Sequence, residues 1–146
     1  MIKKILVALD GSDHATHALN FALDLAEKYS AEIQLLTVVP PILIPTYSFY
    51  VLKQNVLAEC AKQLETSFRG VLSKAVGKAK KEKPNLKVFT KLEHGDPDEK
   101  IVETAERGDF DIIVMGSRGL GRRQTALGSV SSKVVDKATC PVLIHK

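Results

Sequence analysis

The chain has 146 residues, 45% of them apolar and 26% charged, which is the size and composition of a single soluble domain with a substantial core. No apolar run approaches the roughly 18 residues that a membrane-spanning helix needs, so we expect no membrane segment. The net charge is +4, and the lysine-rich stretch 74–83 has no aromatic residues among its lysines, so we expect a solvated helix end there and no nucleic-acid partner.

The first part of the chain predicts a strand, a helix and a second strand. Residues 2–9 are typical of a buried strand and run into Asp10-Gly11-Ser12-Asp13, a turn followed by a helix cap. Apolar residues then recur at helical spacing to about residue 28. Residues 33–39 are a second β-branched run, closed by two prolines.

A long crossover follows, residues 40–85. Apolar side chains keep an i, i+3/i+4 spacing over 57–79, which predicts one long helix. Gly70 and Gly77 lie off this stripe, and each is expected to cost about 1 kcal/mol relative to alanine. Segment 41–50 is unusually apolar for a loop, and three interpretations stay open: a mobile cover over a site, a contact for a partner, or a segment packed on the core.

The last part of the chain repeats the alternation of strands and helices. Residues 88–92 form a less apolar strand, expected near a sheet edge, and Gly95-Asp96-Pro97 opens a helix with the proline near its first turn. The remaining expected elements are a strand at 111–115, a helix at 129–138 and a strand at 141–145. This order predicts one doubly wound α/β domain, residues 1–146, with a parallel sheet covered on both faces. Ligands bind such sheets beyond the carboxyl ends of the strands, where the strand order reverses.

Cysteine and histidine usage gives two further expectations. Cys60 and Cys140 lie far apart without CxxC spacing, so we expect both to be small buried apolar side chains. The first residues enter a strand at once, without the features of a signal peptide, and we expect a cytoplasmic protein. His14 and His17 are i, i+3 neighbours, but with no third ligand in view we expect no metal site there.

A glycine-rich loop separates the strand at 111–115 from the helix at 129–138. A strand, a glycine loop and a helix start together bind phosphate through main-chain N–H groups and the helix dipole. The loop has no GxxxxGK[ST] motif, and Gly119-Leu-Gly121-Arg-Arg-Gln124 has glutamine where a dinucleotide fingerprint needs its third glycine or alanine. We therefore expect a phosphate or nucleotide site that follows neither of these patterns.

Three stretches together identify a family resemblance: KKILVALDGSDHA, HGDPDEKIVETA, and MGSRGLG followed by LGSVSSKVVDKATCPVLI. On these residues the chain resembles the universal stress protein family over its full length. The resemblance implies five parallel strands in the order 3-2-1-4-5, the adenine nucleotide alpha hydrolase-like fold, and a homodimer paired through the last strand. The nucleotide-binding branch of the family carries G-x2-G-x9-G-[ST], whereas eight residues separate Gly119 from Gly128 here.

For the nucleoside, the resemblance implies a site at the ends of three strands. Asp10 would accept hydrogen bonds from ribose hydroxyls, as an acceptor-only carboxylate can. Ala8 would leave room for the nucleoside, and Val38 would contact adenine. Met115 and Gly116 would line the nucleoside side of the site.

For the phosphates, the resemblance implies ATP binding. Separately, Mg²⁺ could accompany a bound triphosphate, with Asp13 or Ser129 nearby. Gly119 would let the loop approach the phosphates, and N–H groups would come from Gly128, Ser129 and Val130. Arg118, with Arg122 and Arg123 further along the loop, is a candidate for charge-assisted bonds to phosphate.

Alternatives to these roles stay open. Asp10 is equally suited to form a turn or cap a helix, Ser129 to cap the last helix, and the loop arginines to be solvated. No catalytic constellation is visible, so the leading hypothesis is an ATP-binding stress protein with at most slow ATP hydrolysis. The second hypothesis is a dimeric interaction module that binds no nucleotide and acts through its dimer surface and segment 41–50. An enzyme of the broader fold is a third, without a motif to support it.

Overall fold

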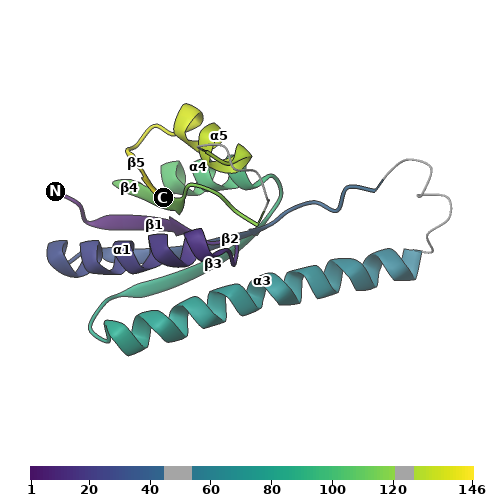
Figure 1. Cartoon of the computed structure of the whole chain (residues 1–146), viewed down its shortest axis with the longest axis horizontal. Coiled ribbons are helices and arrows are strands. Elements are labelled where there is room, and N and C mark those ends of the chain that lie inside the picture. The colour runs from purple at the N-terminus through teal and green to yellow at the C-terminus, as the bar shows by residue number, and fades with distance from the viewer. Residues whose placement is uncertain (45–53, 121–126) are drawn as a thin grey trace.

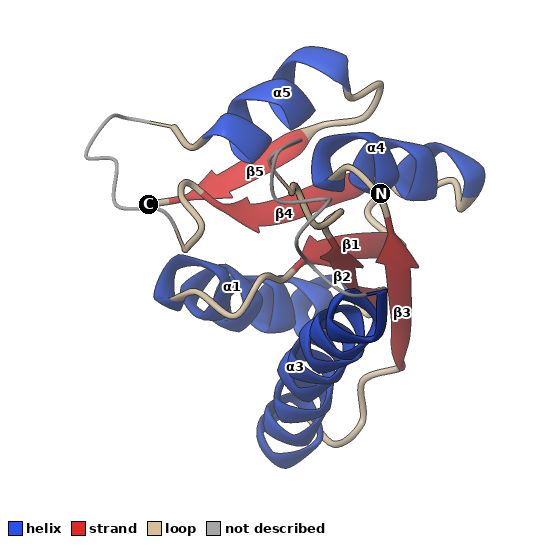
Figure 2. Cartoon of the chain, turned by 90° about the vertical axis from the view of Figure 1, so that its right-hand side faces the viewer, coloured by secondary structure: helices blue, strands red, loops and turns tan. Residues whose placement is uncertain are grey.

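Five parallel strands form one sheet in the order β3-β2-β1-β4-β5 (Figure 2). The sequence pattern predicted the parallel sheet, and the family resemblance implied this order. The structure is a computed structural model that describes residues 1–44, 54–120 and 127–146. The strands are β1 (Lys4–Ala8), β2 (Glu32–Val39), β3 (Val88–His94), β4 (Ile112–Gly116) and β5 (Val142–His145). The strand at 88–92 was predicted near an edge, and β3 is the strand at one edge of the sheet.

Two helices cover each face of the sheet (Figure 2). The helices are α1 (Asp13–Tyr29) and α3 (Gln54–Glu82) on one face, and α4 (Pro97–Arg107) and α5 (Ser129–Lys137) on the other. Neighbouring residues of one strand point to opposite faces, so Val7 joins the core under α1 and α3 while Leu6 joins the core under α4 and α5. This double burial explains why the strands read as continuous apolar runs.

The connection from β1 to α1 carries the turn and cap that the sequence predicted. Gly11 has φ +86, a left-handed conformation that favours glycine. Ser12 is the N-cap of α1, and its hydroxyl accepts a hydrogen bond from the Ala15 N–H at 3.2 Å. The carboxyl end of β1 is therefore followed at once by a tight turn that leads into α1.

The first half of α3 extends beyond the sheet (Figure 1). The buried residues of this 29-residue helix are Leu72, Ala75 and Ala79, all in its second half. The prediction that Cys60 is buried is wrong: its thiol is exposed, because that turn of the helix lies outside the sheet, and Cys140 is half-buried.

Segment 41–50 is described only as far as residue 44, and 45–50 lie outside the described residues. Ile42 is 41% exposed and Leu43 is 89% exposed, so packing on the core is excluded for these two side chains. Among the helices that the structure describes, none combines the length and hydropathy needed to cross a bilayer.

Candidate functional site

A hollow of about 730 Å³ opens between the carboxyl ends of β1 and β4. These two strands are neighbours, and the chain builds β2 and β3 on one side of them and β5 on the other, so the strand order reverses here. Nine of the ten predicted site residues line the hollow: Ala8, Asp10, Met115, Gly116, Arg118, Gly119, Gly128, Ser129 and Val130. Val38, the tenth, does not line it but is buried in the same apolar cluster as Ala8 and Met115.

Asp10 faces both the corner after β1 and the hollow. Its Oδ1 accepts a hydrogen bond from the Ser12 N–H at 2.9 Å, so the turn-forming role is present, while the helix cap is Ser12. Its Oδ2 faces Gly119 so closely that a Cβ added to Gly119 would lie well inside 3.0 Å of that oxygen. A side chain at 119 would therefore force the carboxylate of Asp10 to turn away or the loop to move.

Gly116 ends β4 against the first turn of α1. A Cβ at Gly116 would lie 2.8 Å from both the carbonyl carbon and the Cβ of His14. Glycine at this position lets the helix start pack directly on the strand end, which fixes one wall of the hollow.

Both sides of the glycine loop are tied to Ser117, which is 1% exposed. The Ser117 carbonyl accepts the Gly128 N–H at 2.7 Å and the Ser131 hydroxyl at 2.8 Å. The N–H of Gly128 is thus already paired, which corrects the expectation that it is offered to phosphate. Ser117 and Ser131 were not predicted, because neither residue type nor spacing marks a contact across a loop.

The first turn of α5 presents main-chain N–H groups to the hollow. Gly128 is the N-cap, with φ −69 and ψ 166, and the helix begins at Ser129, so the alternative that Ser129 is the cap is wrong. Among the described residues, no side chain caps this helix start. The N–H groups of Ser129, Val130 and Ser131 belong to the first turn, where α-helices leave donors without an intrahelical partner and where the dipole favours an anion.

Arg118 brings a cation to the same end of the hollow. The residue is half-buried, and its Nε is enclosed without a hydrogen-bond partner among the described residues. An enclosed guanidinium donor without an acceptor is unfavourable unless an anion completes it. Arg122 and Arg123 lie outside the described residues.

The residues of the site that the structure describes do not form a preformed metal centre. No group of three His, Cys, Asp or Glu side chains within residues 1–44, 54–120 and 127–146 is arranged to hold a metal ion. The rings of His17 and His145 lie with centroids 6.1 Å apart. Asp13 does not line the hollow, whereas Ser129 does.

Comparison with known proteins gives one consistent family. The model of the universal stress protein family matches residues 1–146. Universal stress protein YxiE of Bacillus subtilis is 35% identical over 149 residues, which cover 99% of each chain. The solved structure of universal stress protein UspA from Lactobacillus plantarum has a TM-score of 0.84 at 25% identity, covering 99% of this chain and 98% of that one. The structure of a universal stress protein from Archaeoglobus fulgidus in complex with dAMP has a TM-score of 0.67 at 24% identity, covering 100% and 98%.

Proposed function

The chain belongs to the universal stress protein family, and from this premise we propose that it binds an adenine nucleotide, ATP foremost, and acts as a nucleotide-dependent regulator in the stress response. The observation that carries the proposal is the first turn of α5 beside Arg118, in one hollow at the reversal of strand order; within the part of the chain that the structure describes, no side chain caps this turn and nothing pairs with Nε of Arg118. A related protein in complex with dAMP supports adenine as the base.

In this proposal the phosphates bind at the N-terminus of α5. The N–H groups of Ser129 and Val130 and the guanidinium of Arg118 supply donors, and the missing Cβ of Gly119 keeps the loop close to them. The shortened loop is compatible with this role, because the Ser117 carbonyl fixes the loop's end at Gly128. A bound triphosphate brings Mg²⁺, for which the Ser129 hydroxyl is the nearest protein ligand that we propose.

The nucleoside lies over the ends of β1 and β4. The Asp10 carboxylate keeps Oδ2 free of the turn contact and accepts ribose hydroxyls, and the small Ala8 side chain leaves space beside Met115. Val38 acts indirectly in this proposal, as part of the buried apolar cluster that supports Ala8 and Met115 beneath the nucleoside.

Hydrolysis of ATP is slow at most in this proposal. Asp10 is the one carboxylate among the described residues that line the hollow, and the ribose and the Ser12 N–H both use it. Phosphoryl transfer needs a group that orients the attacking water, and none of these lining residues is left for that task. The nucleotide therefore serves as a signal of state.

We also propose a cytoplasmic homodimer that pairs through β5. One side of β5 is bonded to β4, and the other side meets no strand among the described residues, an arrangement that proteins usually cover or pair. The thiols of Cys60 and Cys140 are free, as is typical of a reducing compartment.

Calorimetric titration of the purified protein with ATP, ADP, AMP and adenosine tests nucleotide binding. Arg118→Gln should weaken ATP about 10- to 150-fold, the effect of losing one charge-assisted hydrogen bond, and should leave adenosine within threefold. Arg107→Gln is the matched control, since Arg107 pairs with Glu103 on α4 and does not line the hollow. No binding of any of the four ligands at millimolar concentration would reject the proposal and favour the interaction module.

A further inference from the structure

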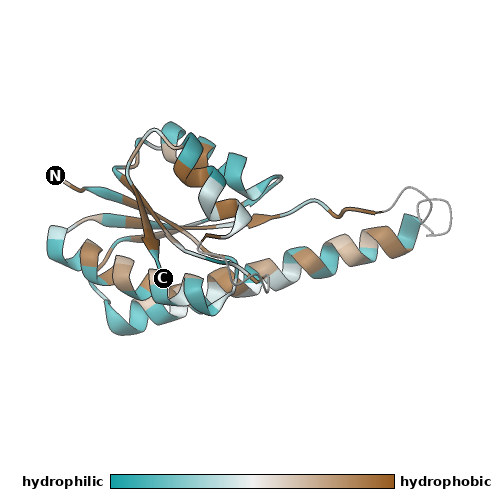
Figure 3. Ribbon diagram, turned by 45° about the horizontal axis from the view of Figure 1, so that its top comes forward, coloured by the Kyte–Doolittle hydropathy of each residue, from teal (hydrophilic) through white to brown (hydrophobic). Residues whose placement is uncertain are grey.

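The first half of α3, residues 54–69, packs on the rest of the chain much less than the second half does. Figure 3 shows it extending beyond the sheet, with both apolar and polar residues along it. The buried residues of the helix all lie in the second half. Four residues of the first half are half-buried and the others are exposed: Leu57, Leu64, Glu65 and Phe68. A helix segment this short is marginal in water without packing, so the first half depends on the few contacts that it makes.

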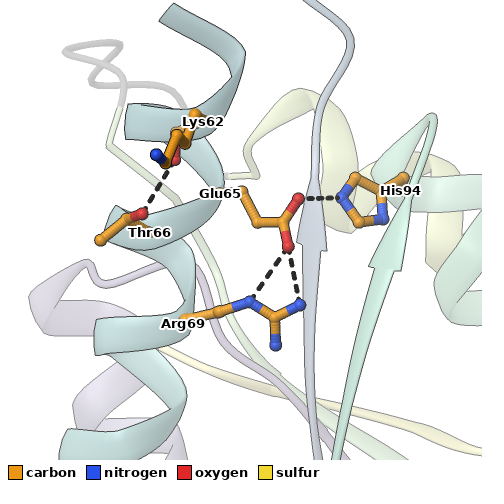
Figure 4. A network of polar contacts seen from close by, with 5 residues as sticks. All are labelled: Lys62, Glu65, Thr66, Arg69 and His94. Carbon is orange, nitrogen blue, oxygen red and sulfur yellow. Dashed lines mark hydrogen bonds and ion pairs between the residues drawn. The ribbon is translucent and has the colours of Figure 1, made fainter. Parts of the chain in front are cut away.

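One side-chain contact ties this half to the sheet (Figure 4). Glu65 Oε2 lies 3.1 Å from Nε2 of His94, the last residue of β3. Within residues 1–44, 54–120 and 127–146, no other side-chain hydrogen bond or ion pair joins α3 to the sheet. The polar attachment of the first half of α3 to the described fold is therefore this single contact.

The sheet side of this contact is held firmly. His94 is paired with Val39 of β2 in the register of the sheet, and the Gly95 N–H donates to the Val39 carbonyl at 3.1 Å. The helix side has no comparable support. A change at the contact will therefore move α3 more readily than it moves the strand.

Glu65 stays ionised near neutral pH. Its Oε1 accepts hydrogen bonds from Arg69 Nε at 3.0 Å and from Arg69 Nη2 at 2.7 Å. These bonds with Arg69, and after them the bond with His94, lower the pKa of the Glu65 carboxyl. The guanidinium of arginine is protonated at every pH of interest. The group of this contact that changes charge near neutral pH is the imidazole, a side chain that ordinarily titrates at about pH 6.5.

The charged groups around His94 do not titrate in the same range. Carboxylates, lysines and arginines keep their charge between about pH 5.5 and about pH 7.5. Glu93 points to the opposite face of the sheet from His94, because neighbouring residues of a strand alternate. Segment 40–44 carries no ionisable side chain. The remaining groups are Lys62 on α3, Asp96 before α4 and Lys100 on α4.

We propose that the contact is a pH-dependent latch: protonated His94 holds the first half of α3 against the end of β3, and neutral His94 releases it. A protonated imidazole gives the Glu65 carboxylate a charge-assisted hydrogen bond, which is about twice as strong as a bond between neutral groups. The two side chains are 59% and 36% exposed, so water screens the pair. The latch therefore adjusts how often this half opens, by about two- to fivefold, the range of exposed ion pairs.

The direction of the effect follows from the charge. The attachment is strongest below the ordinary titration range of histidine and weakens as the pH rises through it. Leu57, Ala61 and Leu64 of this half form one wall of an apolar groove of about 720 Å³ beside segment 40–44. Release of the latch loosens that wall. The latch requires no nucleotide and does not depend on the function proposed above.

Millisecond hydrogen exchange of the full chain, read by mass spectrometry, measures this opening. Rates are taken at about pH 5.5 and about pH 7.5, and each is divided by the intrinsic rate of an unstructured peptide at the same pH. Protection of the amides at 59–66 should be about two- to fivefold higher at the lower pH. Amides at 72–79, in the packed half, should show no difference. Equal protection of 59–66 at both pH values would overturn the proposal.

Three variants assign the difference to the latch. His94→Gln and Glu65→Gln keep a polar side chain but remove the ion pair, so each should abolish the pH difference. Glu65→Gln also loses the bonds with Arg69, so its protection should fall at both pH values. His17→Gln, which removes an exposed histidine of α1, is the matched control and should keep the full difference.

The variants should fold like the parent protein, because each replaced side chain is at least partly exposed. Circular dichroism and the melting temperature check this. A pH difference that persists in His94→Gln, or one that disappears in His17→Gln, would show that another group is responsible and would overturn the proposal.

Discussion

Replacing Gly119 by alanine is the sharpest single-atom test of the site. The added Cβ would lie well inside 3.0 Å of Asp10 Oδ2, so the carboxylate must turn away or the loop must move. Turning Asp10 also breaks the 2.9 Å contact of its Oδ1 with the Ser12 N–H. Hydrogen bonds to charged groups contribute about 1.5–3 kcal/mol, so we expect ATP to bind about 10- to 150-fold more weakly to Gly119→Ala.

Gly128→Ala is the matched control within the same loop. Its backbone has φ −69, and a Cβ there would lie 3.4 Å from its nearest neighbours, which is ordinary van der Waals contact. Its N–H is already paired with Ser117, so the ATP dissociation constant should stay within threefold of the parent protein's. Calorimetric titration at pH 7.5 measures both constants. Equal weakening by the two substitutions, or binding by Gly119→Ala within threefold of the parent, would refute this account of the loop.

Three further predictions concern stability and assembly. Gly77→Ala should raise the free energy of unfolding in urea by about 1 kcal/mol, because its Cβ meets nothing within 4 Å, whereas Gly11→Ala, at φ +86 and 3.0 Å from Val71 Cγ2, should lower it. Lys137 Nζ lies 2.8 Å from the Asp98 carboxylate, whose side chain is 9% exposed, and lowers the pKa of that carboxyl. The ion pair therefore stabilises the fold at pH values above the ordinary pKa of aspartate, and this contribution is lost as the pH falls through the lowered pKa. Asp98→Asn should therefore cost about 1–2 kcal/mol at pH 7, and a cost that did not shrink below about pH 4 would contradict the assignment. The carbonyls of Pro141 and His145 accept hydrogen bonds on the β4 side, so the backbone of Ile144 faces the open edge of the sheet. Ile144→Pro should therefore give a species of half the mass in sedimentation, whereas Ile144→Ala should not. An unchanged mass for the proline variant would place the dimer contact elsewhere.

The order of elements was predictable because it depends on residues close in sequence. The continuous apolar strands, the Ser12 cap and the proline at the start of α4 each signal local structure without reference to the rest of the chain. The strand order 3-2-1-4-5 came from the family resemblance, and the reversal between β1 and β4 then brought Asp10 and Gly119 together.

The parts that could not be predicted depend on contacts distant in sequence. The apolar stripe of α3 shows which face of the helix is apolar, but it does not show where the sheet ends, so Cys60 was wrongly expected to be buried. Likewise, the Ser131 hydroxyl donates a hydrogen bond to the Ser117 carbonyl, fourteen positions earlier in the chain, and no local sequence pattern predicts this contact. The helix itself begins at Ser129, as the sequence predicted, with Gly128 as its cap.

The most direct test of nucleotide binding follows the main-chain amides at the start of α5. In ¹H–¹⁵N correlation spectra, the amide resonances of Ser129, Val130 and Ser131 should shift saturably as ATP is added, and adenosine should move them far less. If these three resonances do not shift at millimolar ATP, the N-terminus of α5 is not a phosphate site and the proposed function is wrong.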